Sequence, residues 1–342
     1  MAAEDDVPET YSNAYVVMDA KTGQVLLQKN MYEKEYPASI TKILTTALGL
    51  TYAKPEDRIT VSQETVSDVW KWGETTHLAL EPGEIITLKD ALYGAMVESA
   101  NDCANAIAQA VSGSLADFAE LMNQQVAALG LSDSHFTNAH GLPDKDHYTT
   151  AYDIYLMCQA AMEHETFRAI TSSRSHDLPA TEFHEARTIY DTNALISSWQ
   201  YGSRYLYQYA TGIKTGSTPE AGYCLAASAT KEDRNLISVV LGCEREPNTT
   251  GSDGFIYFDE TIRLFDWGFN NFPRQVMLDG TKRDIPEVAV TLGKDTNYVT
   301  LEPQGEIEAL LPRDVGPEDF TYSTTRNAES VEAPVEKGQQ LG

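Results

Sequence analysis

Residues 37–46 read PASITKILTT, which opens an apolar helical pattern and places a single lysine in it. Pro37 suits a first helical turn, so we expect Ser39 near the N-terminus of this helix. Lys42 follows three residues later, and residues three apart are neighbours on a helix surface. The hydroxyl and the amine can therefore meet where the amine is poorly solvated. Taken alone, the pattern is also typical of a capping serine and of a lysine whose amine reaches solvent.

The composition places the chain among globular proteins. It has 342 residues, of which 42% are hydrophobic, and a formal net charge of −26. The length allows a full core and favours two domains. Such a negative surface repels nucleic acid and anionic lipid head groups, so we expect neither as a direct partner. The charges are spread along the chain, which is also typical of a protein that needs them only for solubility.

No part of the sequence looks like a membrane span or a secretory signal. No stretch approaches the roughly 20 apolar residues that cross a bilayer. Met1 is followed by the polar run AAEDDVPETYS, so we expect no signal peptide in this chain. The polar start does not indicate a cytoplasmic protein, because it is also typical of a processed or trimmed sequence.

Two pairs of side chains raise the possibility of a covalent or metal link. Cys224 and Cys243 fall in strand-like runs on either side of the polar turn TKEDRN. A hairpin would bring them near the same rung, so the sequence allows a cross-strand disulfide or two free thiols. His140 and His147 are seven residues apart and have no third ligand nearby. We therefore expect no metal site and no cofactor, and interpret the imidazoles as hydrogen-bonding groups of their loop.

Hydrophobic periodicity predicts a sheet covered by helices. Residues 14–30 alternate around a turn and predict a β-hairpin, whereas residues 58–88 are mixed and indicate mostly loop. Thr87 with Asp90, and Thr150 with Asp153, have the spacing of helix-capping pairs. Helical patterns cover residues 91–99, 102–111, 115–129, 149–162 and 255–272, and strand patterns cover residues 207–216, 222–229 and 236–243.

These elements predict two domains. Residues 1–272 contain the hairpin, the helices and the later strands, with a helical subdomain at roughly residues 60–160, and this order is typical of an α/β (α+β) fold. After residue 272 the chain turns to short alternating runs separated by turn residues. We expect a small all-β domain at residues 273–342, and we expect its last strands to lie beyond the end of this chain.

Two further motifs present polar side chains at sites where a cleft could form. The segment MVESANDCA places Ser99 and Asn101 at the break between two predicted helices, either facing a cleft or terminating and capping those helices. The segment IKTGST, residues 213–218, places Lys214, a hydroxyl and a glycine on a strand that another backbone could approach. Lys-Thr-Gly also occurs at residues 21–23, where we interpret it as a hairpin turn without a catalytic role.

The order of these motifs resembles a known superfamily. Ser-x-x-Lys at residue 39, Ser-x-Asn at residue 99 and Lys-Thr-Gly at residue 214 resemble the signature of penicillin-binding proteins and serine β-lactamases. Within it the chain is most similar to the D-alanyl-D-alanine carboxypeptidases, the low-molecular-mass penicillin-binding proteins. The stretches DAKTGQVLLQKN, YPASITKILT, TNAHGLPDKDHYTTAYDI, GIKTGSTPEAGYCLAASA and APVEKGQQLG carry this resemblance from residue 14 nearly to the C-terminus. It implies a transpeptidase/β-lactamase-like domain with an antiparallel sheet, a helical subdomain and the cleft between them.

The resemblance implies an acyl-enzyme route. Ser39 would attack the carbonyl between two D-alanines, and Lys42 would take its proton. Burial among apolar residues and the second cation, Lys214, are both expected to lower the pKa of Lys42, so that it is neutral for part of the cycle. Ser99 would relay a proton to the departing D-alanine. Asn101 would bind the substrate amide and orient Lys42, and Lys214 would complete the polar network.

The strand that carries Lys-Thr-Gly is implied to bind substrate. Thr215 and Thr218 are candidates for holding the terminal carboxylate, and Gly216 allows a second backbone to come close. The N–H groups of Ser39 and Ser217 would form the oxyanion hole. Members of the family often have histidine at the position of Ser217, so we expect a change in the polarity of the cleft but the same backbone donor.

Two other positions differ from the family pattern. The middle motif has Ala100 where relatives have Gly or Asp, which we interpret as a tolerated change. The family often uses an arginine after the sheet hairpin to bind the substrate carboxylate. Arg245 lies nearby, but its spacing does not align cleanly, so we leave that role unassigned.

The implied partners are peptidoglycan stem peptides as substrates and β-lactam antibiotics as covalent inhibitors. The implied place is the cell envelope, outside the cytoplasmic membrane. Members of this family usually have a C-terminal amphipathic membrane anchor. We expect that anchor to be absent from this chain. The protein would therefore contact a membrane only through such an anchor.

Three alternatives stay open. A class A β-lactamase directs its hydrolytic water with a Glu-x-x-x-Asn loop, and residues 102–213 contain no such pattern. A β-lactam sensor or cell-wall binding module would keep the same motif residues without releasing D-alanine. An endopeptidase or transpeptidase would share the acyl-enzyme and differ only in the acceptor.

Overall fold

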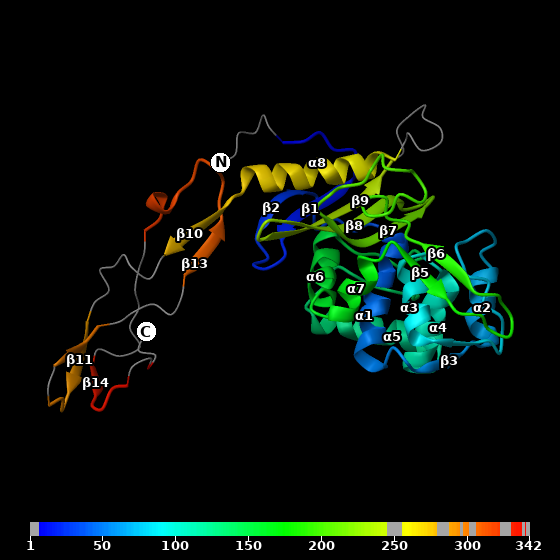
Figure 1. Cartoon of the computed structure of the whole chain (residues 1–342), viewed down its shortest axis with the longest axis horizontal. Coiled ribbons are helices and arrows are strands. Elements are labelled where there is room, and N and C mark those ends of the chain that lie inside the picture. The colour runs from blue at the N-terminus through cyan, green and yellow to red at the C-terminus, as the bar shows by residue number, and fades with distance from the viewer. Residues whose placement is uncertain are drawn as a thin grey trace. The chain divides into compact units, whose positions relative to one another are not determined.

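A five-stranded antiparallel sheet forms the centre of residues 8–269, with the strand order β2-β1-β9-β8-β7 (Figure 1). The hairpin predicted for residues 14–30 is confirmed, because β1 and β2 pair antiparallel. Every residue of β1 is buried, as expected for a strand between two neighbours and under helices. The strands are β1 Ala14–Asp19, β2 Val25–Lys29, β7 Ala210–Thr218, β8 Gly222–Lys231 and β9 Arg234–Cys243.

Helices cover both faces of this sheet. Helix α8, Ile256–Asn271, lies on one face, where a Cβ at Gly268 would be 3.0 Å from Leu236 Cδ1 (Figure 1). On the other face α6, Ala151–Ala161, packs on the sheet, and the hydroxyl of Tyr155 donates to the carbonyl of Asp19 at 2.9 Å. The helices around α6 are α1 Lys42–Tyr52, α3 Leu88–Met96, α4 Asn101–Ser112, α5 Leu115–Ala128 and α7 Glu165–Thr171. The predicted α/β (α+β) class, an antiparallel sheet with helices on it, is confirmed.

The capping pairs predicted from sequence are present. The hydroxyl of Thr87 accepts from the backbone N–H of Asp90 at 3.1 Å, and that of Thr150 accepts from Asp153 N–H at 3.0 Å. Each pair therefore satisfies a donor that the first helical turn leaves free. The Lys-Thr-Gly copy at residues 21–23 forms the β1–β2 turn, where the carboxylate of Asp19 accepts from Thr22 N–H at 2.7 Å.

Several short elements were not predicted. Residues 58–88 are mixed and rich in loops, as expected, but they also contain helix α2, Gln63–Trp70, which Ser62 caps by accepting from Thr65 N–H at 3.2 Å. This helix is short and buries only Thr65, Val66 and Val69, too few for a clear helical period. The other short elements are β3 Arg58–Thr60, β4 Ile85–Thr87, β5 Ser175–Leu178 and β6 Arg187–Tyr190.

The chain from residue 270 onward forms a second compact unit. Apart from a 3-10 turn at Pro317–Asp319, the regular elements among its described residues form small sheets, as predicted for a β-rich domain. The boundary predicted between residues 272 and 273 stays a proposal. In one sheet β10, Arg274–Leu278, pairs with β13, Ile307–Leu310; in the other β11, Val288–Thr291, pairs with β12, Tyr298–Val299, and with β14, Ser330–Glu332.

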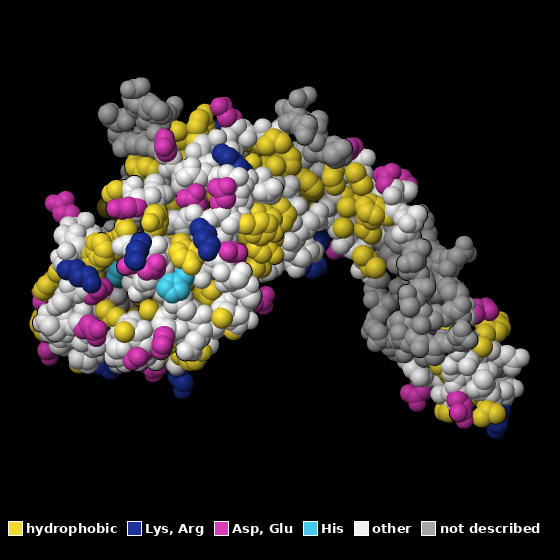
Figure 2. All heavy atoms as spheres, turned by 180° about the vertical axis from the view of Figure 1, so that it is seen from behind, with side chains coloured by type: hydrophobic (Ala, Val, Ile, Leu, Met, Phe, Trp, Pro, Cys, Tyr) yellow, Lys and Arg dark blue, Asp and Glu magenta, His cyan; other side chains and the backbone are white. Residues whose placement is uncertain are grey.

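The computed structural model describes residues 7–244, 255–278, 287–294, 297–300, 306–321, 330–336 and 339. Among these residues no helix combines the length and the apolar character needed to cross a membrane. On the face of residues 8–269 seen in Figure 2, acidic side chains are scattered among basic and uncharged ones. The large negative charge is therefore not concentrated in one patch of that face.

The two cysteines that we considered for a disulfide are free. In the sheet Cys243 pairs directly with Tyr223, and a register shift follows between Tyr223 and Leu225. Paired residues share a face and neighbours along a strand point to opposite faces, so Cys224 points away from Cys243. Consistently, the Cys224 thiol lies 3.7 Å from the carbonyl oxygen of Tyr36.

Candidate active site

Ser39 lies in a 3-10 turn, Ala38–Thr41, that leads directly into α1. No side chain caps this turn, so the interpretation of Ser39 as a capping serine is wrong. Lys42, the first residue of α1, is completely buried, so its amine does not reach solvent. The Lys42 Nζ lies 2.8 Å from the Ser39 Oγ, as the three-residue spacing predicted.

Lys42 has two further oxygen partners. Its Nζ lies 2.7 Å from Asn101 Oδ1 and 2.8 Å from the backbone carbonyl oxygen of His140. Both of these oxygens can only accept hydrogen bonds. A neutral amine has two N–H donors and one lone pair. In its neutral form Lys42 therefore donates to Asn101 and His140 and directs its lone pair at the hydroxyl of Ser39, which is the geometry of a general base.

The environment of Lys42 favours this neutral form. Burial lowers the pKa of Lys42 well below its ordinary value, and the cation of Lys214 lowers it further, against the opposing effect of Asp102. Burial also lowers the pKa of Lys214, opposed by the carboxylates of Asp191 and Glu98. Two amines thus lie buried near each other, and the cation of Lys214 disfavours the charged form of Lys42.

The Ser99 loop joins α3 to α4, as predicted. Ser99 has a φ of +67°, in the left-handed region, and its side chain is nearly buried. This conformation costs a non-glycine residue roughly 1–2 kcal/mol, so the surrounding contacts must hold it. The N–H of Ala100 donates to the Gly94 carbonyl and that of Asn101 to the Thr76 carbonyl, both at 2.9 Å. The N-cap of α4 is Ala100, so neither Ser99 nor Asn101 is a capping residue.

Strand β7 lies directly against the Ser39 turn. A Cβ at Gly216 would be 2.9 Å from the backbone nitrogen of Ser39 and 3.1 Å from the carbonyl oxygen of Pro37. We expected the lack of a side chain at Gly216 to let another backbone come close. In the structure the backbone that comes close is that of the protein's own Ser39 turn. A contact of Gly216 with substrate stays a prediction.

The other strand residues have defined local contacts. The hydroxyls of Thr215 and Thr192 lie 2.6 Å apart, and the hydroxyl of Thr218 accepts from Ala221 N–H at 3.0 Å. Ser217 is exposed. The roles of these residues in binding substrate, including the oxyanion donor of Ser217, stay predictions. Arg245 lies outside the described residues.

A family model described as D-alanyl-D-alanine carboxypeptidase matches residues 1–245. This chain belongs to the D-alanyl-D-alanine carboxypeptidase family. It is similar to the D-alanyl-D-alanine carboxypeptidase DacC of Escherichia coli, with 30% identity over 365 residues, 100% of this chain and 82% of that protein. It is also similar to DacF of Bacillus subtilis, with 29% identity over 332 residues, 96% of this chain and 79% of that protein.

Solved structures give the same result. Penicillin binding protein 5 from Haemophilus influenzae has a TM-score of 0.75 at 27% identity and covers 98% of this chain and 92% of its own. The Streptomyces K15 DD-transpeptidase has a TM-score of 0.68 at 26% identity and covers 77% of this chain and 98% of its own. The predicted family, fold and class of enzyme, a serine peptidase, are therefore confirmed.

One segment at the active site of this peptidase was missed in the sequence. The N–H of Tyr190 lies 3.4 Å from Glu98 Oε2, and Thr192 N–H donates to the Val97 carbonyl at 3.1 Å. With the Thr192–Thr215 contact, residues 190–192 tie the Ser99 loop to β7. The sequence YDTNAL has no periodicity that would have indicated this, and Asp191 is buried close to Lys214 only through the fold.

The two histidines hydrogen-bond within and around their loop. His140 Nε2 lies 3.0 Å from Asp68 Oδ2, and His147 Nε2 lies 2.8 Å from the hydroxyl of Thr41. Burial lowers the pKa of His147 to about 3, so this imidazole is neutral. Across the described ranges, no three or more His, Cys, Asp or Glu side chains are arranged to hold a metal ion.

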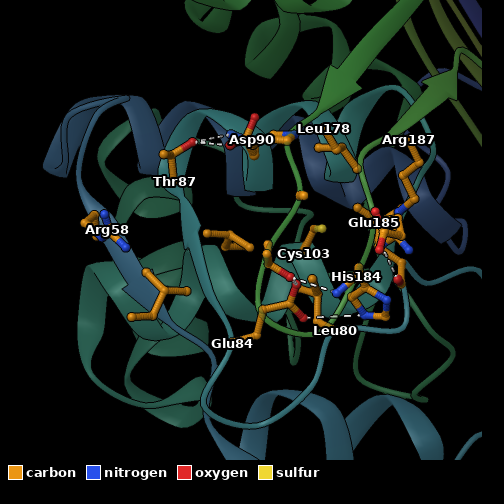
Figure 3. A pocket seen from close by; sticks show the side chains of 16 residues that line it. Arg58, Leu80, Glu84, Thr87, Asp90, Cys103, Leu178, His184, Glu185 and Arg187 are labelled. Carbon is orange, nitrogen blue, oxygen red and sulfur yellow. Dashed lines mark hydrogen bonds and ion pairs between the residues drawn. The ribbon is translucent and has the colours of Figure 1, made fainter.

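A cavity of about 210 Å³ is lined by residues of the helical subdomain, among them Cys103 near the start of α4, and by side chains of residues 178–187 at the β5–β6 connection (Figure 3). Neither Ser39 nor Lys214 lines it, so it is separate from the active site. Several of its polar groups are paired with protein groups: Glu84 accepts from Thr181 at 2.7 Å, and Arg187 donates to the Leu78 carbonyl at 2.6 Å. On the wall it shares with α4, Asp102 accepts from Leu78 N–H at 3.0 Å and so holds the helix turn that carries Asn101.

Proposed function

We propose that this protein removes the terminal D-alanine from peptidoglycan stem pentapeptides through an acyl-enzyme on Ser39, and that β-lactams acylate the same oxygen. The observation that carries this proposal is the contact of 2.8 Å between Lys42 Nζ and Ser39 Oγ, with the other two directions of the amine occupied by acceptors. A serine hydroxyl is a weak nucleophile until such a base removes its proton.

The first step follows from this geometry, and the roles given to Ser217 and Ser99 rest on the family resemblance. Lys42 takes the hydroxyl proton as Ser39 Oγ forms a bond to the carbonyl carbon between the two D-alanines. The N–H groups of Ser39 and Ser217 stabilise the resulting oxyanion, and one such donor is typically worth about 3 to 4 kcal/mol. The C–N bond then breaks, and the proton that Lys42 took passes through the hydroxyl of Ser99 to the departing D-alanine nitrogen. Water then attacks the remaining ester and gives a proton to neutral Lys42, which passes it to Ser39 Oγ as the ester bond breaks, so that the shortened peptide leaves and Ser39 is restored.

The proposed place and partners follow from the substrate. Peptidoglycan lies outside the cytoplasmic membrane, so we assign the protein to the cell envelope. The reaction as written needs no cofactor and no nucleic acid, because every proton transfer has a side chain of this chain to perform it.

Release of D-alanine from a peptide ending in D-Ala-D-Ala tests the proposal. We expect D-alanine in equimolar amount with the shortened peptide, and a long-lived penicillin adduct that mass spectrometry locates on the tryptic peptide containing Ser39. A persistent adduct without D-alanine release would instead identify a sensor. Repeated hydrolysis of penicillin without a persistent adduct would identify a β-lactamase.

Acylation is expected to be slow at low pH and to speed up as pH rises. Replacing Lys214 with glutamine should shift this rise in the acylation rate to higher pH. Acylation needs neutral Lys42, so its rate rises with pH through the pKa of Lys42. The Lys214 cation lowers that pKa, and without it the pKa rises and more of Lys42 is protonated at any given pH. Penicillin acylation rates measured across the pH range check this.

The matched control is Lys21→Gln, in the other Lys-Thr-Gly copy, which lies in a turn at the sheet edge. This change should leave the rise in the acylation rate at the parent pH. Suppose instead that Lys214→Gln lowers the acylation rate at every pH without changing the pH at which the rate rises. That result would contradict an electrostatic link between the two amines.

A further inference from the structure

The two acceptors that orient Lys42 come from separate parts of the chain. Asn101 is the first residue of α4, whereas His140 belongs to the loop between α5 and α6. Each must stay within hydrogen-bond distance of the same amine for its lone pair to face Ser39. One carboxylate, that of Asp68 on α2, contacts both the loop and the helix.

On the loop side Asp68 holds the imidazole of His140. The Nε2 of His140 lies 3.0 Å from Asp68 Oδ2, and its Nδ1 accepts from the N–H of Leu142 at 3.1 Å. The ring therefore carries its proton on Nε2 and donates it to Asp68. The N–H of His140 and that of Gly141 donate to Asn138 Oδ1 at 3.2 and 2.7 Å. The carbonyl of His140 thus has a fixed direction toward Lys42.

On the helix side Asp68 holds Asn105. The Nδ2 of Asn105 donates to the same Asp68 Oδ2 at 3.0 Å and to the carbonyl of Thr65 at 3.2 Å. Asn105 follows Asn101 by four residues and therefore lies on the same face of α4 one turn later. A single carboxylate oxygen thus links the helix that carries one acceptor to the loop that carries the other.

The charges around Asp68 fit this arrangement. Burial by itself would raise the pKa of Asp68, but hydrogen bonds from His140, Lys71 and Asn105 lower it below its ordinary range. Burial lowers the pKa of His140, with Asp68 opposing and Lys42 and Lys71 contributing in the same direction as burial. A neutral imidazole therefore faces an ionised carboxylate, which is the state that the Leu142 contact requires.

We propose that Asp68 is a positioning residue of this peptidase, which holds the two acceptors of Lys42 and through them the direction of its lone pair at Ser39. Asp68 touches neither Ser39 nor Lys42 and acts only through His140 and Asn105. The inference rests on the proposed function, because it assigns Asp68 a part in the acylation of Ser39.

The test compares Asp68→Ala with Asp68→Asn in the full chain. Alanine removes the contacts with His140 and Asn105, together with the ion pair to Lys71, and a displacement of about 1 Å at a reacting group can cost about 10²-fold in rate. We therefore expect the limiting rate of acylation by a fluorescent penicillin to fall about 10²-fold, with little change in the half-saturating concentration. Asparagine keeps an oxygen that can accept from both partners, so this variant should retain a rate within about threefold of the parent.

The matched control is Asp90→Ala. Asp90 makes a second carboxylate–imidazole contact in the same subdomain, 2.9 Å from His176 Nε2, and is also the capping partner of Thr87. This variant should lose thermal stability and keep the parent acylation rate. If Asp68→Ala fails to fold, Asn105→Leu provides a second test, because it removes the contacts of Asn105 with Asp68 and with the Thr65 carbonyl but keeps the contact of Asp68 with His140, and it should lower the limiting rate about tenfold.

The outcomes separate the two proposals. If the parent forms no Ser39 adduct and releases no D-alanine, the proposed function is wrong. If the parent is active and Asp68→Ala or Asn105→Leu acylates at the parent rate, the positioning role is wrong. The positioning role is also wrong if Asp90→Ala lowers the acylation rate as much as Asp68→Ala does. It is wrong as well if Asp68→Asn acylates no faster than Asp68→Ala.

Discussion

A Ser39→Ala variant is expected to lose about 10⁶-fold in kcat for D-alanine release, as serine peptidases do when the nucleophile is removed. Alanine has no oxygen that could form the acyl-enzyme, so the penicillin adduct should vanish as well. The fold should be nearly unaffected, because the buried amine of Lys42 keeps its contacts with Asn101 and His140. The lost hydrogen bond is worth about 1 kcal/mol, which corresponds to a melting temperature within about 2–4 °C of the parent.

Ser114→Ala is the matched control for this experiment. The Ser114 hydroxyl caps α5 by accepting from Asp117 N–H at 3.1 Å. Removing a helix cap costs about 1 kcal/mol, so this variant should lose comparable stability and keep its activity. Measuring D-alanine release, adduct formation and melting temperature for both variants separates a chemical role from a structural one. Adduct formation by Ser39→Ala would show that another side chain is the nucleophile.

The pairing of Ser39 with Lys42 could be predicted from the sequence because it is local. Both residues lie within one turn, and the helical spacing alone brings the hydroxyl to the amine. Ser99, Asn101 and Lys214 are different, because their motifs are short and common and no local rule brings them together. The family resemblance grouped them, and the contact of Lys42 with Asn101 is now explicit in the structure.

The parts of the site that were missed depend on long-range contacts. Asp68 lies in a helix whose short buried stripe gives little periodicity, and its partner His140 follows 72 residues later. A histidine and an aspartate at that separation carry no pattern that a single sequence reveals. The disulfide alternative failed for a related reason, since one shifted residue in a strand register moves a side chain to the opposite face.

A Gly141→Ala variant is expected to lose both stability and activity. Gly141 has a φ of +92°, which strains any side chain, and a Cβ there would overlap the carbonyl oxygen of Ala38 and come within 2.8 Å of the Thr41 hydroxyl. Left-handed strain and overpacking together cost roughly 3–6 kcal/mol. For a domain of this size that lowers the melting temperature by roughly 10–20 °C.

The loss of activity is expected because the overlap would push the Ser39 turn and the His140 loop apart. Ala38 precedes the proposed nucleophile Ser39, and Gly141 follows His140, whose carbonyl accepts from Lys42. Relief of the overlap must move one backbone away from the other and so pull the acceptor from the amine, which should lower the acylation rate at least about 10²-fold.

Gly130→Ala is the matched control, because Gly130 has a φ of +73° and no atom within 4 Å of an added Cβ. It should cost only the strain, roughly 1–2 kcal/mol, and leave acylation intact. Equal losses in the two variants would show that the close contact of the His140 loop with the Ser39 turn does not hold the site together.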